Sequence, residues 1–178
     1  MLLFWERGYE GASFEALATA MGINASSFRN TFKTKEALYR EATDAYVRET
    51  GAWFSNILSS ETDVRAAFTR LFEETATLYT RENCPLGCMI SAAALHVPPG
   101  HETLREMMSA HRTSAEHAMA ERLAQGQRDA QIADELDTQV LASFFNTLFR
   151  GMAIQARDGA SRSRLLEITK VAMGAFPG

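Results

Sequence analysis

Five polar side chains lie within six consecutive residues near the N-terminus, in the sequence SSFRNT. Four are short hydrogen-bonding groups and the fifth is a guanidinium: Ser26, Ser27, Asn30, Thr31 and Arg29. Short donors and acceptors can reach the base edges or phosphates of a nucleic acid, and an arginine can bond a guanine through two hydrogen bonds. The same residues could instead form the solvated face of an ordinary helix. Their chemistry therefore depends on the elements that hold them.

The surrounding sequence predicts two short helices joined by a tight turn. The first is expected over 14–21 and the second over 25–32, after the turn Gly22-Ile23-Asn24. Apolar residues recur so that both helices can share one small core: Leu17, Ala18, Met21, Ile23, Phe28 and Phe32. This pattern is typical of a helix-turn-helix whose second helix lies in the major groove of DNA. We expect the DNA-facing residues to be Ser13, Ala25, Ser26, Ser27, Arg29, Asn30, Thr31 and Lys35.

The charge distribution favours local rather than general nucleic-acid binding. The whole chain carries a net charge of −4, while residues 1–48 hold six basic and six acidic residues. Within 25–35, however, Arg29, Lys33 and Lys35 have no acidic neighbour. Lys35 also sits at a predicted helix N-terminus, where backbone N–H groups favour a phosphate. A locally basic helix on an acidic body is consistent with a site-specific DNA binder.

The remainder of the chain has the apolar spacing of helices throughout. Helices are expected over 35–58, 63–81, 86–97, 102–127, 136–156 and 161–176, with Pro85 opening the third of these and Gly126 ending the fourth. No alternating strand pattern stands out. We therefore predict an all-α protein of about nine helices, with a DNA-binding domain over 1–48 and a second helical domain over 49–178.

The first helix is expected from Leu2 to Arg7, with Gly8 as its stop. Such a helix is too short to be a complete element. The sequence therefore predicts that the first helix begins before Met1.

The last two helices have apolar stripes about two residues wide at every turn. This width indicates burial on two sides, one against the chain's own core and one against a second copy. The expected dimer interface comprises Leu141, Phe144, Leu148, Met152, Leu165, Ile168 and Met173. A simple internal helix pair is the alternative.

The two cysteines, Cys84 and Cys88, are spaced four residues apart, so one helix face could present both. With His96 or His101 they could form a soft-metal site or a thiol sensor. Free cysteine in an apolar run is more often a small core residue, and we favour that interpretation.

Composition and motifs exclude several classes of function. No apolar run approaches the ~20 residues needed to span a bilayer, and two cysteines do not suggest a disulfide framework. We find no secretory signal, phosphate-binding glycine loop or catalytic constellation. We expect a cytoplasmic protein that is not an enzyme and carries no resident cofactor or metal.

The predicted helix-turn-helix and the residues on either side of it resemble the TetR family of bacterial transcriptional regulators. The resemblance covers residues 4–48 and rests on Gly8-Tyr9, Ser13-Phe14, Leu17-Ala18, Met21-Gly22-Ile23, Phe28, Phe32 and Lys35-Glu36-Ala37-Leu38. The Gly87-Cys88-Met89 step and the segment 151–160 are similar, more loosely, to a subgroup near the copper-responsive regulators of outer-membrane permeability. Family members usually carry an aromatic residue directly after the position of Phe28, where this chain has Arg29.

The resemblance implies an effector pocket inside the second domain. The Met and Phe residues there are first of all core, but they could also enclose an adaptable apolar pocket. The expected lining is Trp53, Phe68, Phe72, Met89, Met107, His111, Phe145 and Phe149. We thus expect a homodimeric repressor that binds a palindromic operator and is released by a small molecule. The alternative is a helical small-molecule or thiol/metal sensor that does not bind DNA in this form.

Overall fold

The computed structural model describes residues 1–93, 97 and 99–177, and within them every regular element is a helix. The nine helices of this described part are α1 (Leu2–Gly11), α2 (Phe14–Ala20), α3 (Ala25–Phe32), α4 (Lys35–Ser60), α5 (Val64–Tyr79), α6 (Met89–Ala92), α7 (Glu102–Arg128), α8 (Thr138–Arg157) and α9 (Arg162–Gly174). The all-α expectation is confirmed. None of the described helices is both long enough and apolar enough to cross a membrane.

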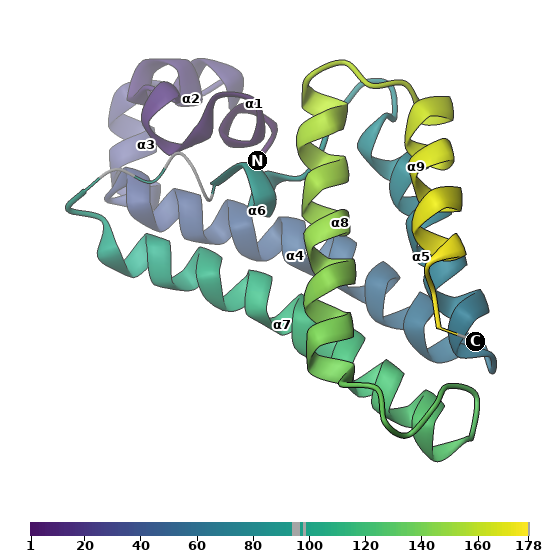
Figure 1. Ribbon diagram of the computed structural model, residues 1–178. Helices are drawn as coiled ribbons and strands as arrows, with labels where there is room; N and C mark the ends of the chain where they lie inside the picture. Colours follow the sequence, from purple (N-terminus) through teal and green to yellow (C-terminus); the bar gives the residue numbers. More distant parts are fainter. Residues whose placement is uncertain (94–96, 98, 178) are drawn as a thin grey trace.

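The helices divide the molecule into a small head and a larger body (Figure 1). Helices α1–α3 gather at one end of α4, while α5, α8 and α9 stand at the other side. Helices α4 and α7 run side by side between these groups, in contact with each other. The long α4 therefore belongs to the head at its start and to the body at its end.

Short polar caps begin the helices of the head. The Asn24 side chain accepts a 2.8 Å hydrogen bond from the backbone N–H of Ser27, and the Thr34 hydroxyl accepts one of 3.1 Å from that of Ala37. Each cap satisfies a backbone donor that has no partner inside its helix. The starts of α3 and α4 at residues 25 and 35 therefore match the sequence prediction.

Gly8 interrupts α1 as its residue type suggested. Its φ of 71° is positive, and the chain returns to a short helical turn that ends at Gly11. A residue with a Cβ would be strained in that conformation. The kink turns Tyr9 into the core, where it is 5% exposed.

Helix α4 continues without a break across the expected domain boundary at residues 48 and 49. Its 26 residues correspond to a rod of about 39 Å. A division at residue 48 would therefore cut through one rigid element. The two-domain description stays a prediction, and α4 is a mechanical link in either case.

Aromatic packing holds the body together. Phe68 and Phe72 of α5 meet Phe145 of α8 with ring centroids 4.8 and 5.7 Å apart, and Phe176 stacks on Phe145 at 5.4 Å. All three helical phenylalanines are fully buried. This cluster ties α5 and α8 to the C-terminal segment.

Two sequence expectations about helix ends were wrong. Pro85 does not open a helix: α6 begins only at Met89, and residues 94–96 of the expected 86–97 helix lie outside the described part. The backbone at Gly87 is not helical, since its φ is 77°, and a Cβ at this position would meet the Ala153 carbonyl oxygen of α8. The expected end of α7 at 127 is within one residue of the observed Arg128, but Gly126 is not the stop: it lies inside the helix, next to Val64.

Candidate nucleic-acid interface and internal cavity

Helix α3 presents a polar face to solvent. Ser26, Ser27, Arg29, Asn30 and Thr31 are all exposed. The opposite side is anchored by one buried aromatic ring, that of Phe28, which contacts Phe14 and Phe32 with centroids 5.3 and 5.4 Å away. Short polar groups on a firmly anchored helix are the arrangement that base reading requires.

The other expected DNA-facing residues have local roles in the head. Ser13 caps α2 by accepting a 3.1 Å hydrogen bond from the N–H of Ala16. Lys35 is half-buried, with its Nζ 3.4 Å from the Glu10 carbonyl oxygen and 4.6 Å from the Tyr9 ring centroid. Ala25 is the first residue of α3.

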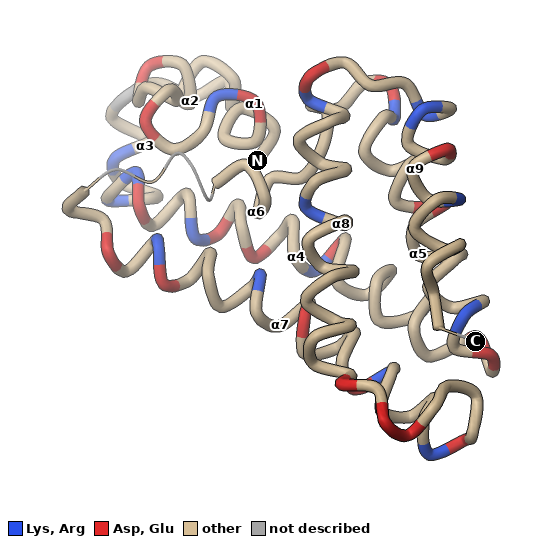
Figure 2. The backbone as a smooth tube through the Cα atoms, viewed as in Figure 1, with Lys and Arg blue, Asp and Glu red and all other residues tan. Residues whose placement is uncertain are grey.

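Lys33 is exposed directly after α3 and was left out of the predicted set. Figure 2 shows basic segments where α3 meets α4. The signal in the sequence was the run of three cations without an acid in 25–35. Lys33 therefore joins Arg29 as an exposed cation beside the polar face of α3.

A cavity of about 170 Å³ lies in the body, lined by residues of α4, α5, α7, α8 and the segment around α6. Three of the residues expected to line it do so: Trp53, His111 and Phe149. Three more aromatic side chains line the cavity: Tyr46, Phe54 and Tyr79. Helix α4 thus forms one wall of the cavity and also packs against α3.

Five expected lining residues do not reach this cavity. Phe68, Phe72 and Phe145 fill the aromatic core of the body instead, where they are inaccessible to a ligand. Met89 packs near the head, beside Phe4 and Trp5, and the sulfur of Met107 lies 3.8 Å from Arg40. Sequence spacing identified apolar residues correctly but could not separate solid core from cavity wall.

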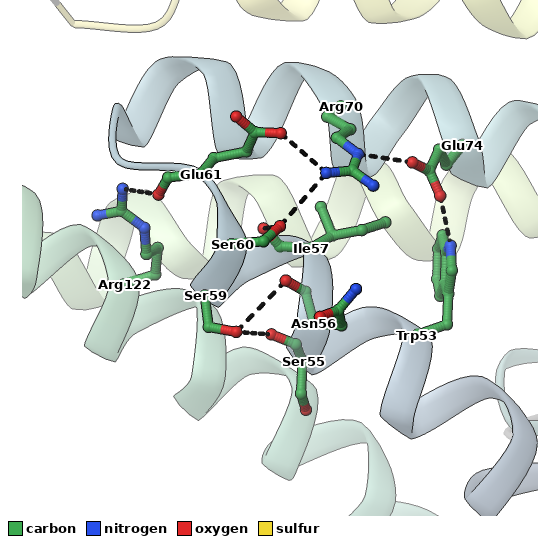
Figure 3. Close-up of polar contacts among 10 residues, drawn as sticks. All are labelled: Trp53, Ser55, Asn56, Ile57, Ser59, Ser60, Glu61, Arg70, Glu74 and Arg122. Carbon is green, nitrogen blue, oxygen red and sulfur yellow. Dashed lines mark hydrogen bonds and ion pairs between the residues drawn. The ribbon is translucent and has the colours of Figure 1, made fainter.

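A polar network fixes the orientation of Trp53 in the cavity wall (Figure 3). Its indole N–H donates a 2.7 Å hydrogen bond to Glu74, which also pairs with Arg70 at 2.7 Å. The hydrogen bond from Arg70 is the main reason that the pKa of Glu74 is lowered. Arg70 in turn reaches Glu61 at 2.9 Å, so the network joins the end of α4 to α5.

Polar groups in the cavity wall were missed by the sequence prediction. The Tyr46 hydroxyl donates a 3.3 Å hydrogen bond to the Cys88 sulfur, and burial raises the pKa of Tyr46. Arg112 and Arg150 line the same cavity. A sequence signal existed for Arg150, since α8 contains two arginines and no acidic residue.

Neither cysteine forms a disulfide: Cys84 is partly buried and Cys88 is buried. His96 lies outside the described residues. His101 packs instead on the Tyr9 ring at 4.8 Å and lies 4.0 Å from carboxylate oxygens of Glu10 and Glu36. The described part contains no group of three His, Cys, Asp or Glu side chains arranged to hold a metal.

The last two helices carry an exposed apolar surface of four residues. Val140, Phe144 and Ile154 of α8 are 66%, 48% and 36% exposed, and Val171 of α9 is 78% exposed. We call these four residues the α8–α9 face. Single exposed apolar residues are ordinary on a protein surface, and these four lie on two helices that contact each other.

The α8–α9 face differs from the expected dimer interface. Met152, Leu165 and Met173 are buried inside the chain itself, so they have no surface to offer. Leu141, Leu148 and Ile168 are partly buried against the core, and Phe144 alone of the expected set is exposed. The inner half of the wide stripe supplies the subunit core, and burial of its outer half against a second copy stays a prediction.

Two family models match this chain in succession. Residues 1–42 match the model described as bacterial regulatory proteins, tetR family, and residues 66–169 match that of the tetracyclin repressor-like C-terminal domain. The second match alone covers more than half of the chain. The chain belongs to the TetR family. It is thus a member of a family of transcriptional regulators, as its helix-turn-helix residues indicated.

Similar TetR-family proteins span nearly the whole chain. The HTH-type transcriptional repressor ComR of Escherichia coli (strain K12) is 29% identical over 178 residues, which are 99% of this chain and 85% of ComR. The repressor BdcR of the same organism is 23% identical over 92% of this chain and 78% of BdcR. A solved structure of a cysteine-substituted regulator CifR with 26-base-pair operator DNA is 36% identical, covers 99% of this chain and 92% of CifR, and has a TM-score of 0.94.

Proposed function

We propose that this TetR-family protein is a cytoplasmic, homodimeric repressor that binds palindromic operator DNA and is released by a small effector. The observation that carries the proposal is the similarity along the full chain to CifR, whose structure includes operator DNA. The exposed polar face of α3 supplies side chains suited to that task.

The proposed DNA contacts are Ser26, Ser27, Arg29, Asn30 and Lys33. All are exposed and lie on α3 or directly after it. Thr31 is a weaker candidate because its hydroxyl donates a 3.0 Å hydrogen bond to the Ser27 carbonyl. Ser13 and Lys35, which have partners in the head, would position the helix rather than read DNA.

The α8–α9 face is the proposed contact between two copies. A two-fold dimer buries the same patch on both subunits, so exposed apolar residues on two adjacent helices suit it. The two-fold axis would place two copies of α3 about one DNA turn, or a small multiple of it, apart. A palindromic operator follows from that symmetry.

The effector would release DNA through the helices that contact both the cavity and the head. Helix α4 lines the cavity at Tyr46 and Trp53 and begins beside α3. Helix α7 lines it at His111, and the Thr103 hydroxyl near its start donates a 3.1 Å hydrogen bond to Glu36 of α4. A ligand that favours a different position of α4 would lower DNA affinity by its differential affinity for the two arrangements.

The proposal is tested by selecting bound duplexes from a random double-stranded DNA library with the purified chain. The expected result is enrichment of one palindromic sequence with two half-sites. The same selection with Arg29→Ala should weaken or lose the enrichment, whereas Arg164→Ala, on an exposed side chain of α9, should retain it. Failure of the wild-type chain to enrich any sequence would favour the alternative of a sensor that does not bind DNA.

A further inference from the structure

We infer that the cavity takes a small organic anion, with an apolar body of about one ring and an acid group that pairs with Arg112 and Arg150. The regulatory meaning of this ligand rests on the proposed function. Its binding, however, depends only on the cavity.

The volume limits the size of the apolar body. A cavity of about 170 Å³ is close to the size of an engineered apolar cavity of roughly 150 Å³ that binds benzene. The walls facing it are largely apolar, with Trp53, Phe54, Leu78 and Phe149 among them. One aromatic ring or a chain of similar volume would fill this space.

The charge of the lining is one-sided. Arg112 and Arg150 both line the cavity, and the lining within the described part of the chain contains no Asp or Glu. Arg112 forms no ion pair with any described residue, and its Nη1 is buried without a hydrogen-bond partner there. Burial and the neighbouring charge of Arg150 lower the pKa of Arg112, although an arginine stays protonated in proteins. The Arg112 side chain is partly buried, but this one nitrogen has no partner, and an anion in the cavity would supply one.

The nearby carboxylate of Glu116 pairs with Arg150 but forms no ion pair with Arg112. One of its oxygens accepts a 2.6 Å hydrogen bond from Ser143 and the other one of 2.6 Å from Asn146. Arg150 lies 3.9 Å from the second oxygen and donates a 3.2 Å hydrogen bond to the Arg112 carbonyl. That bond joins the Arg150 guanidinium to the main chain of Arg112, and the two charges are close enough for Arg150 to lower the pKa of Arg112. Of the two guanidinium groups, only that of Arg150 pairs with a described carboxylate, and this carboxylate already accepts two other hydrogen bonds.

Neutral and cationic ligands fit this arrangement less well. A neutral apolar molecule would gain the same burial but leave Arg112 unpaired, and a cation would be repelled by both arginines. A carboxylate matches the planar fork of an arginine through two hydrogen bonds. The cavity should therefore bind an acid more tightly than the uncharged isostere of that acid.

Isothermal titration of the full chain with matched acid and amide pairs tests the inference. The probes are benzoate and benzamide, 3-phenylpropanoate and 3-phenylpropanamide, and octanoate and octanamide. At least one acid should bind about tenfold or more tightly than its amide, the effect expected when a hydrogen bond to a charged group is lost. Arg112→Gln and Arg150→Gln should each reduce that preference, and Arg164→Gln should leave it unchanged.

Equal or tighter binding of the amide in every pair would overturn the inference, as would no binding of any acid at millimolar concentration. The comparison within the wild-type chain needs no variant to fold. DNA binding by the ligand-free chain is measured separately. Acid binding without DNA binding would contradict the proposed function alone, and DNA binding without an acid preference would contradict this inference alone.

Discussion

Arg157, at the end of α8, donates a 3.0 Å hydrogen bond to the main-chain carbonyl of Trp5 in α1. Its second terminal nitrogen donates a 3.1 Å hydrogen bond to the Glu6 carbonyl. These carbonyls precede the break at Gly8, where the last carbonyls of a helical turn have no partner within the helix. One arginine thus joins the helix that carries most of the α8–α9 face to the first helix of the head.

We expect Arg157→Ala to loosen this junction. The loss of two hydrogen bonds from a charged but exposed donor should lower the free energy of unfolding by about 1 kcal/mol. Amide hydrogen exchange should rise mainly in residues 1–11, and mass spectrometry of the exchanged peptides measures it. Arg157→Lys retains the charge at the end of α8 but cannot form the same fork, so it should show most of the effect. Unchanged exchange in residues 1–11 would show that the contact does not hold the head.

The N-cap of α3 gives a second prediction. Asn24→Ala removes the acceptor for the Ser27 N–H and should cost about 1 kcal/mol of stability. Asn24→Ser can still cap the helix and should remain close to the wild type. Denaturant unfolding of the three proteins measures the difference. Equal loss in the serine variant would mean that the amide has a role other than capping.

Glu36 should make part of the head-to-body contact dependent on pH. Hydrogen bonds from Arg40, at 2.8 Å, and from Thr103 lower the pKa of Glu36 from its ordinary value of 4.5. Because the folded-state pKa is depressed, the contribution of the carboxylate is complete above pH 4.5 and is lost as the pH falls through the folded-state pKa. Glu36→Gln should therefore lower the free energy of unfolding at neutral pH by about 0.5 kcal/mol, and the Tm should fall with it.

The gap in Tm between wild type and Glu36→Gln should close as the pH is lowered below 4.5. Thermal unfolding followed by circular dichroism measures it across the range. The same comparison in a His101→Gln background separates the contribution of the nearby imidazole. A gap that does not change with pH would contradict the electrostatic origin of the contact.

The proposed dimer should depend on the α8–α9 face. Phe144→Asp places a carboxylate on that surface and should shift the protein to a monomer, because burying an unpaired charge at an interface is unfavourable. The matched control is Leu86→Asp, at an exposed apolar residue outside α8 and α9. Size-exclusion chromatography with light scattering distinguishes the masses. If both variants keep the mass of the wild type, the surface does not mediate self-association.

Local chemistry made much of the fold predictable. Asn24, Thr34 and Ser161 each cap a helix that begins at the next residue. The helix-turn-helix was also recognisable because its anchors and polar face alternate within a few residues, and Phe28 is buried while Arg29 is exposed. These features depend on neighbours in the chain, which a sequence displays directly.

The errors arose where distant segments decide the outcome. Gly126 would end a helix by local rules but instead allows Val64 to approach α7. Phe72 and Phe149 have the same residue type and similar spacing, yet one is solid core and the other lines the cavity. Arg112 could be placed beside Arg150 only once α7 and α8 were packed together.

The central claim is that α3 reads DNA sequence, and Arg29 is the exposed cation on that helix. The most direct measurement is the affinity of the wild type and of Arg29→Ala for one selected palindromic duplex and for its scrambled counterpart, at matched salt. The wild type should prefer the palindrome, and Arg29→Ala should weaken that specific binding by roughly 1–3 kcal/mol with a much smaller effect on the scrambled duplex. Equal affinity of the wild type for both duplexes would contradict the claim.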